Sequence, residues 1–380
     1  MKLGIHLTLL IGPVVPMPAP AFLLEAMDDV EVTHDDEGRS GFQIKFRVGR
    51  SGVADIVDYL PLTLPLLRPF NRVVIVVTVD VMPKVLFDGF ITHQELAPGA
   101  SSITVTGEDV SVMMDLQEKS VEYPAMPEPL IAAMLIAQYA IPCGLIPKII
   151  PPALPNPPPN PFDYVPVQHE TDLAYLKTMA RRFGHVFYII PGPAPGTNTA
   201  YWGPRAGPNL PQSALSVNMG PNTNVDSISF KNDAMAPAVT GGMVQDRLTN
   251  VPLPVAGVPL QSLMNVPPLA AMPSWVVNQP NVRTTMFRES GLNYAEALTR
   301  AMGAADAASD VVTAEGELDA TRYGDVLQAR GIVGVRGAGF TYDGFYYVKR
   351  VKHSIRRGQY RQRFMLTREG IGATSPVVVP

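Results

Sequence analysis

Apolar and polar residues alternate along much of the first 115 residues of the chain. In FQIKFRV (42–48) every second side chain is apolar, and this period of two predicts a half-buried strand. The acidic turn at 35–38 predicts a hairpin between that strand and one around 30–33. The nearly continuous Val and Ile run at 72–81 predicts a strand buried on both faces. Further strands are expected at 86–93 and 103–106. Short strands at this spacing predict a small barrel or sandwich.

A helical period replaces the alternation in the middle of the chain. In ETDLAYLKTMARRFG (170–184) the apolar side chains share one helical face, and Glu170 or Thr171 can cap the start. Gly184 stands where a left-handed residue would end the helix. The strand HVFYII (185–190) follows directly. Further helices are expected at 108–116, 128–139 and 293–308.

Strand-like patterns return in the last third of the chain. Strands are expected at 215–217, 225–230, 311–318, 326–335, 346–355 and 360–367. Three proline-rich stretches (142–166, 191–211 and 250–292) are expected to be stiff linkers or irregular loops, because proline breaks both helices and central strands. Two strand-rich regions therefore flank a mixed middle.

The composition indicates a protein that buries much of its surface. Apolar residues make up 46% of the 380 residues and charged residues only 17%, and 39 residues are proline. Such a chain is long enough for about two to four domains. Part of its apolar surface is expected to contact other subunits. The net charge of −4 argues against a general nucleic-acid binder, because phosphate neutralisation needs a basic excess.

Two apolar segments imitate membrane signals. The N-terminus has one lysine and an apolar run, but its prolines interrupt it, so a buried N-terminal strand is favoured over a signal peptide. Secretion or membrane anchoring stays open as an alternative. Prolines also interrupt the segment 130–150, which favours a packed core helix over a membrane span.

A search for recognisable chemistry finds no catalytic, cofactor-binding or metal site. The six histidines are scattered, and Cys143, the single cysteine, is expected to be inert in its apolar stretch. The glycines of GVRGAGF (334–340) lie between two predicted strands and are expected to form a turn rather than a nucleotide loop. The acidic stretch at 28–37 is expected to be a solvated hairpin tip rather than a metal site.

One block of charge stands out near the C-terminus. Between residues 342 and 370 there are eight basic and two acidic residues, a local excess of six positive charges. Seven of the basic residues are candidates for an interface or a pore lining: Lys349, Arg350, Lys352, Arg356, Arg357, Arg361 and Arg363. The block is either the solvated face of an antiparallel hairpin or a docking face for an acidic partner, and the sequence leaves both open.

The C-terminal region resembles the end of the late-control-D family of phage baseplate hubs. The resemblance rests on RYG and VL within 322–327, on YDGFYYVKRVKHSI (342–355) and on YRQRFMLTREG (360–370). Two earlier segments agree with the family in the same order: TGEDVSVMMDLQEKSVEYP (106–124) and QHETDLAYLKTMARRFGHVFYI (168–189). The likeness extends to the hub part of secretion-system VgrG spike proteins.

The resemblance implies a mainly β fold with α+β insertions. It implies two similar small β-barrel domains and peripheral mixed domains, assembled as a homotrimer with a pseudo-sixfold ring. The expected division is a first barrel at 1–115, a mixed peripheral domain with a Pro-rich linker at 116–211, a second barrel at 212–249 and 310–370, an insert at 250–309 and a tail at 371–380.

The same resemblance implies a structural function without enzymatic activity. The chain is expected to join the hexameric tail tube to the trimeric spike of a contractile tail or injection machine. Its expected partners are further copies of itself, a tube or tube-initiator protein, a separate spike protein and other baseplate proteins, without specific nucleic-acid binding or stable membrane insertion. Its expected location is the virion baseplate or an extracellular contractile particle, after assembly in the host cytoplasm. The alternative is a β-rich hydrolase or carbohydrate-binding phage protein, which would use scattered carboxylates and the aromatic residues Trp202 and Trp275.

Overall fold

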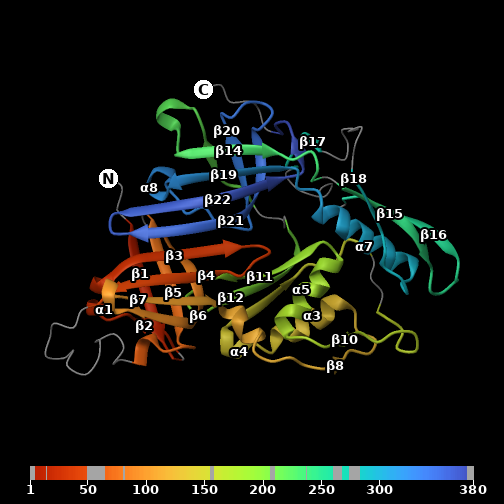
Figure 1. Cartoon of the computed structure of the whole chain (residues 1–380), viewed down its shortest axis with the longest axis horizontal. Helices are drawn as coiled ribbons and strands as arrows, with labels where there is room; N and C mark the ends of the chain where they lie inside the picture. The colour runs from red at the N-terminus through yellow and green to blue at the C-terminus, as the bar shows by residue number, and fades with distance from the viewer. Residues whose placement is uncertain are drawn as a thin grey trace.

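The computed structural model describes most of the chain, and its strands form one large sheet. The described residues are 5–13, 15–48, 65–79, 82–154, 158–205, 210–236, 238–259, 268–273 and 283–374. Among them, 13 strands join into the central sheet, and smaller sheets and helices lie beside it (Figure 1). The prediction of a mainly β fold with α+β insertions is confirmed.

The first strand block is built from the N-terminal third of the chain. Its strands are β1 (His6–Gly12), β3 (Met27–Asp35), β4 (Gly41–Arg47), β5 (Arg72–Val79), β6 (Met82–Ala97) and β7 (Ser102–Asp109). They are hydrogen-bonded in the order β3-β4-β7-β6-β5-β1. All six strands contribute side chains to one apolar core, so the sheet curves around that core. The alternation predicted at 42–48 is present, because Phe42, Ile44 and Phe46 are buried in β4.

The second strand block repeats this arrangement. Its strands are β13 (Gln212–Ser216), β14 (Ser227–Asn232), β19 (Val312–Asp319), β20 (Ile332–Arg336), β21 (Gly344–Arg356) and β22 (Gln359–Arg368). Their order is β14-β19-β22-β21-β20-β13, which matches the first block strand for strand. One difference is that β13 runs parallel to β20, whereas β1 runs antiparallel to β5.

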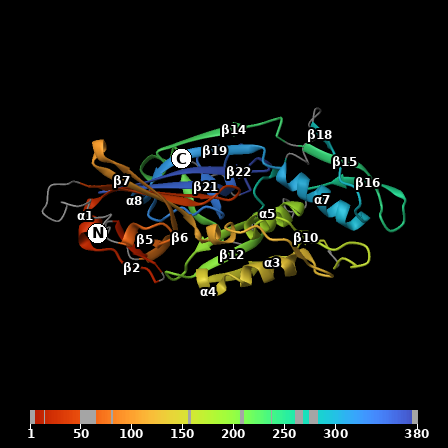
Figure 2. The same ribbon diagram turned by 60° about the horizontal axis from the view of Figure 1, so that its bottom comes forward.

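The two blocks are joined edge to edge within one chain. Strand β3 pairs antiparallel with β21, with Asp35 opposite Arg350 and Asp29 opposite Arg356. The two strands run side by side in both views (Figures 1 and 2). The blocks therefore form one continuous sheet rather than two separate ones.

The middle of the chain forms a separate α/β layer beside the first block. Its sheet consists of β9 (Leu145–Ile149), β12 (Asn198–Pro204) and β11 (His185–Pro191), packed against α3 (Glu128–Ala137) and α5 (Asp172–Arg182). Thr171 accepts a hydrogen bond from the Ala174 amide, and Gly184 has φ 67°, so the helix-then-strand prediction is confirmed. The irregular linkers expected at 142–166 and 191–211 are partly wrong. Both contain strands. Pro147 lies on β9, the edge strand of its sheet, and Pro204 is the last residue of β12, and a proline is tolerated at both kinds of position.

The insert region forms a small sheet covered by one helix. Strands β15 (Ala238–Gln245), β16 (Pro252–Gly257) and β18 (Arg283–Met286) are covered by α7 (Tyr294–Ala307). A capping box between Asn293 and Glu296 begins α7, in agreement with the helix predicted at 293–308. Because β16 and β18 fall within 250–292, the irregular loop expected there is also partly wrong. β15 pairs with both strands, so residues 238–245 lie with the insert. The domain ranges given above stay a prediction.

Three local predictions differ from the structure. The helix expected at 108–116 is a short 3₁₀ helix at Val110–Met114, capped by the Asp109 side chain. The strand expected at 326–335 begins only at Ile332. The apolar segment 130–150 is divided among α3, the short α4 (Ala140–Cys143) and β9.

No helix in the described part of the chain is long and apolar enough to cross a membrane. Residues 6–12 form β1, as predicted for a buried N-terminal strand.

Candidate functional site

The seven basic candidates lie on the β21–β22 hairpin, and each has a partner within the chain. Lys349 pairs with Glu37, Arg350 with Asp35, Lys352 with Glu31, Arg356 with Asp29, and Arg361 and Arg363 with Glu317, while Arg357 donates to the Glu25 backbone oxygen. The acids come from β3, the turn after it and β19, so the local positive excess is largely neutralised. The sequence did not reveal these partners, because strand pairing brings them from distant positions.

Because of these ion pairs, the surface of the hairpin carries paired charges of both signs rather than a block of positive charge. The Arg363 side chain is 75% exposed and the Arg356 side chain 62% exposed, so solvent screens these two ion pairs and they add little to stability. Arg361 and Arg363 both lower the pKa of Glu317, chiefly through the Arg361 hydrogen bond. The two basic strands β21 and β22 thus lie side by side between the acidic residues of β3 and β19. The role of the seven residues at an interface or in a lumen stays a prediction.

The acidic turn after β3 is a solvated hairpin tip only in part: Glu37, Gly38 and Arg39 are exposed, as predicted, but the two aspartates before them are not. Asp35 and Asp36 are only 6% and 2% exposed. One carboxylate oxygen of Asp35 accepts hydrogen bonds from the amides of Glu37 and Gly38, and the other accepts from Arg350. Burial acts to raise the pKa of Asp35, but these hydrogen bonds outweigh it and the pKa is lowered. Asp35 and Asp36 are buried because they lie at the junction of the two blocks.

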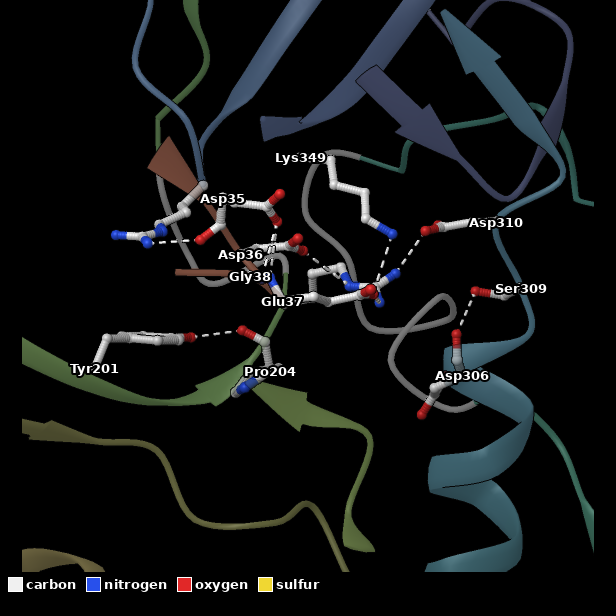
Figure 3. A network of polar contacts seen from close by, with 12 residues as sticks. Asp35, Asp36, Glu37, Gly38, Tyr201, Pro204, Asp306, Ser309, Asp310 and Lys349 are labelled. Atoms are coloured by element: carbon white, nitrogen blue, oxygen red, sulfur yellow. Dashed lines mark hydrogen bonds and ion pairs between the residues drawn. The ribbon is translucent and has the colours of Figure 1, made fainter. Parts of the chain in front are cut away.

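Arg205 connects this turn to two other parts of the chain (Figure 3). Its guanidinium donates to Glu37 at 2.8 Å and to Asp310 at 2.6 Å, and it lies 3.4 Å from Asp36. Lys349 completes the cluster at 3.0 Å from Glu37. Arg205 follows β12, and Asp310 follows α7. The cluster therefore ties the middle layer and the insert to both strand blocks.

A pocket of about 470 Å³ opens beside Arg205 and Asp36. Burial raises the pKa of Asp36 to about 6 against the opposing charge of Arg205, and neither carboxylate oxygen has a hydrogen-bond donor. Burial also lowers the pKa of His185, another lining residue, to about 4. Both carboxylates of the pocket, Asp36 and Glu37, lie within 4 Å of the Arg205 guanidinium. Asp36 and Glu37 therefore both belong to the ion-pair cluster around Arg205.

Arg330 holds the junction of the two blocks from inside. It is 6% exposed and donates to the backbone oxygens of Ile189 and Asp35 and to the hydroxyl of Ser40. Its guanidinium lies 4.2 Å from the ring centre of Tyr188, a cation–π contact. One side chain therefore binds the second block to the first block and to the middle layer.

A second cavity, of about 400 Å³, lies next to Arg330 and is lined by His34 and His353. The two rings meet edge to face with their centres 5.7 Å apart. Gln362 exchanges two hydrogen bonds with the Leu327 backbone, which orients its amide so that nitrogen donates to Nδ1 of His353. Burial lowers the pKa of both histidines, to about 3 for His34. Both histidines are neutral at neutral pH and have a structural role. The sequence did not predict that they lie next to each other.

The remaining candidates are structural. Burial raises the pKa of the Cys143 thiol to about 11, in agreement with the prediction of an inert thiol. Trp202 is fully buried and donates to the Leu176 backbone oxygen, so it is not available to stack on a sugar. Trp275 lies outside the described residues. Gly337 and Gly339 have positive φ in the turn between β20 and β21, as predicted. Within the described ranges no cluster of His, Cys, Asp or Glu is arranged to hold a metal ion.

Comparison with solved structures gives matches over nearly the whole chain. The tail protein of Neisseria meningitidis MC58 aligns with a TM-score of 0.60 and 14% identity, covering 97% of this chain and 98% of that one. The 43 kDa tail protein of prophage MuSo2 from Shewanella oneidensis aligns with a TM-score of 0.62 and 11% identity, covering 96% and 98%. The chain has the fold of phage tail proteins.

A secretion-system protein shares this fold. A component of the E. coli type VI secretion system, described as structurally similar to two T4 bacteriophage tail proteins, aligns with a TM-score of 0.53 and 11% identity, covering 93% of this chain and 77% of that one. No protein-family model and no curated protein sequence matches this chain. The likeness therefore lies in the fold, at sequence identities too low to carry residue roles.

Proposed function

We propose that this chain is a structural baseplate hub that joins the hexameric tail tube to the trimeric spike of a contractile tail or injection machine. The observation that carries the proposal is the duplicated strand order within one continuous sheet. Three copies of a chain with two similar blocks present six blocks to a sixfold tube and keep threefold symmetry for the spike. The shared fold with phage tail proteins supports this role.

The proposed partners are two further copies of the chain, a tube or tube-initiator protein, a spike protein and other baseplate proteins. The proposed location is the baseplate of a virion or of an extracellular contractile particle, after assembly in the host cytoplasm. The basic strands β21 and β22, flanked by acidic residues of β3 and β19, suit a surface that meets partners by charge pattern. Such a pattern raises association rates and selects among partners more than it adds affinity. The seven basic residues are proposed to lie at such an interface or along the lumen.

A non-enzymatic role is part of the proposal. The carboxylates beside the 470 Å³ pocket are engaged by Arg205, and Trp202 is buried in the core of the middle layer. A phage hydrolase or sugar-binding protein would need a free carboxylate pair or an exposed aromatic platform. Incubation of the protein with peptidoglycan and with bacterial surface polysaccharides is expected to give no cleavage products, and release of saccharides would favour the alternative.

Electron microscopy of the purified particle tests the proposal directly. The expected result is density for this fold in a ring between the tube and the spike, and tube and spike proteins that co-purify with the tagged chain. Density for the chain in the sheath or in a peripheral fibre would overturn the hub assignment. Loss of the chain from particles that still carry both tube and spike would do the same.

A further inference from the structure

The two blocks can be matched residue by residue along their hydrogen-bonded rows. A row here means the residues that lie directly opposite one another on successive strands. One row of the first block is Thr33–Gly41–Glu108–Phe90–Arg72. Its counterpart in the second block is Lys231–Thr313–Thr367–Tyr347–Ile332. An irregularity in pairing falls at the same place in both, between Ile91 and His93 in β6 and between Val348 and Arg350 in β21. This shared irregularity fixes the correspondence without an offset.

An unusual backbone conformation confirms the match. Phe70 and Arg330 are equivalent residues before β5 and β20, and both have positive φ, 64° and 68°. Phe70 donates its amide proton to the Ile91 oxygen at 2.8 Å, and Arg330 donates to the Val348 oxygen at 2.7 Å. Left-handed backbone is rare in residues other than glycine, so its recurrence at one position marks a true structural repeat.

The blocks differ at one edge. Beyond Tyr347, where β20 stops pairing, residues Arg350–Arg356 of β21 pair with β3. Beyond Phe90, where β5 stops pairing, residues 93–97 of β6 pair only with β7, within the described part of the chain. The outer edge of β14, the equivalent of β3, likewise has no strand beside it among the described residues. Among the described residues each chain therefore has two unpaired strand edges, one on β14 and one at residues 93–97 of β6, and these are the equivalents of the two edges that meet at its own junction.

We propose that β14 of one copy pairs antiparallel with residues 93–97 of β6 in a second copy, in the register of β3 on β21. This inference rests on the proposed function, in which copies of the chain form a ring. It names the surfaces that meet: the equivalent of the internal junction recurs between copies. Such a head-to-tail contact closes into a ring when the rotation at each step allows it.

The side chains that this register brings together are complementary. Transferring the internal register places Lys231 opposite Glu95, Phe230 opposite Leu96 and Asp233 opposite His93. The Lys231 side chain is 78% exposed, and its ion pair with Asp233 is long at 3.9 Å. Leu96 is 37% exposed although it is a large apolar side chain. Opposite charges and apolar pairs directly across antiparallel strands are the pairs that stabilise a sheet.

Phe70 supplies a second line of support. Its equivalent, Arg330, is buried against the β3–β4 turn at the internal junction, whereas Phe70 is 51% exposed. Pairing of β14 with β6 would bring the segment after β14 over Phe70, as the segment after β3 covers Arg330. An exposed phenylalanine at this position is explained by a partner copy.

Cysteine cross-linking in assembled particles tests the register. The chain carrying Lys231→Cys with Glu95→Cys is expected to form covalent trimers under oxidation, because the two thiols lie directly opposite across copies. The matched control is Thr33→Cys with Lys352→Cys, the equivalent pair within one chain, which is expected to oxidise without a change in mass. The wild-type chain, with buried Cys143 alone, is expected to remain uncross-linked.

Charge reversal gives an independent measurement on the same contact. Lys231→Glu alone and Glu95→Lys alone are each expected to weaken self-association roughly tenfold, and the double reversal is expected to restore it. Oxidation of the control pair without inter-copy cross-links would overturn this inference while the chain remained in the particle as a hub. Inter-copy cross-links in a protein absent from tail particles would support the pairing and overturn the proposed function.

Discussion

Arg330 donates a hydrogen bond to the backbone oxygen of Asp35 at 2.7 Å, across the junction of the two strand blocks. The same side chain serves Ser40 and the Ile189 oxygen, and its charge faces the ring of Tyr188 rather than a carboxylate. Such a buried cation is tolerated because its surroundings supply acceptors on several sides. The two blocks and the middle layer thus share one polar anchor.

Replacement of Arg330 by Ala is expected to destabilise the protein by about 3–5 kcal/mol, because buried acceptors lose their donors and a void remains. Arg330→Lys is expected to recover only part, since an ammonium cannot match the fork of the guanidinium. Denaturant unfolding measures the loss, and hydrogen exchange of the amides at 35–40 is expected to accelerate. Arg363→Ala, at a side chain 75% exposed, is the control and is expected to change stability by less than about 1 kcal/mol. Equal effects of both variants would contradict the anchor role.

The sequence predicted where the strands lie along the chain better than it predicted which strands pair with each other. Alternation located β4, and helix capping located α5 and α7, because those signals are local. The resemblance implied two similar blocks, but not the strand order that they share, because rows such as Thr33–Gly41–Glu108 are assembled from segments far apart in the chain. The segment 191–211 was mistaken for a loop because Pro and Gly at both ends concealed the strand at Asn198–Pro204.

The sequence identified the basic residues of the candidate site but not the acidic partners that surround them. The basic hairpin was identified, but its neutralisation was not, because Glu31 and Glu317 reach it through strand pairing. The burial of Asp36 was missed for the same reason: an acidic turn looks solvated until Arg205 and the second block cover it. Charge counted along a chain is a poor guide to charge on a sheet, where neighbours are set by register.

Arg72 and Asp88 form a buried ion pair whose coupling can be measured. They are joined by two hydrogen bonds of 2.7 and 2.9 Å, and Asn198 of the middle layer donates to the same carboxylate. Asp88→Leu is expected to cost about 3–5 kcal/mol, because it leaves a buried guanidinium without its partner. The double variant Arg72→Met with Asp88→Leu is expected to lose less than the sum of the single losses.

A double-mutant cycle on chemical denaturation isolates this coupling. The matched control is the surface pair of Arg39, 53% exposed, and Glu108, at 2.8 Å, whose coupling is expected to be about 0–1 kcal/mol. Additive losses at Arg72 and Asp88 would show that the pair does not act as a unit.

Asp36 is expected to make the protein less stable as the pH rises. Its pKa is raised from 3.8 to about 6 in the folded state, so between these values the folded chain binds more protons than the unfolded chain. Stability from this residue is present below pH 3.8 and is lost as the pH rises through about 6, by about 3 kcal/mol in total. Asp36→Asn is therefore expected to gain stability over the wild type between pH 4 and 7.

Asp35→Asn is the control, with the opposite sign. The pKa of Asp35 is lowered, so its contribution appears above the unfolded value and Asp35→Asn is expected to lose stability at neutral pH. Urea unfolding from pH 4 to pH 8 compares the two variants with the wild type. Parallel pH profiles for Asp36→Asn and the wild type would contradict a raised pKa at Asp36.

Phe70 is expected to matter for assembly and little for folding. It is 51% exposed and has φ 64°, a conformation that asparagine tolerates better than phenylalanine, so Phe70→Asn is expected to leave the melting temperature unchanged or slightly higher. In an oligomer the same substitution removes an aromatic side chain that the partner copy covers, which is expected to weaken association roughly thirtyfold or more. Light scattering over a dilution series measures the association. Phe162→Asn, at a phenylalanine 98% exposed in the middle layer, is the matched control and is expected to leave the association unchanged, because Phe162 belongs to neither strand block. Equal weakening by the two variants would mean that general loss of apolar surface, and not the junction at Phe70, drives assembly.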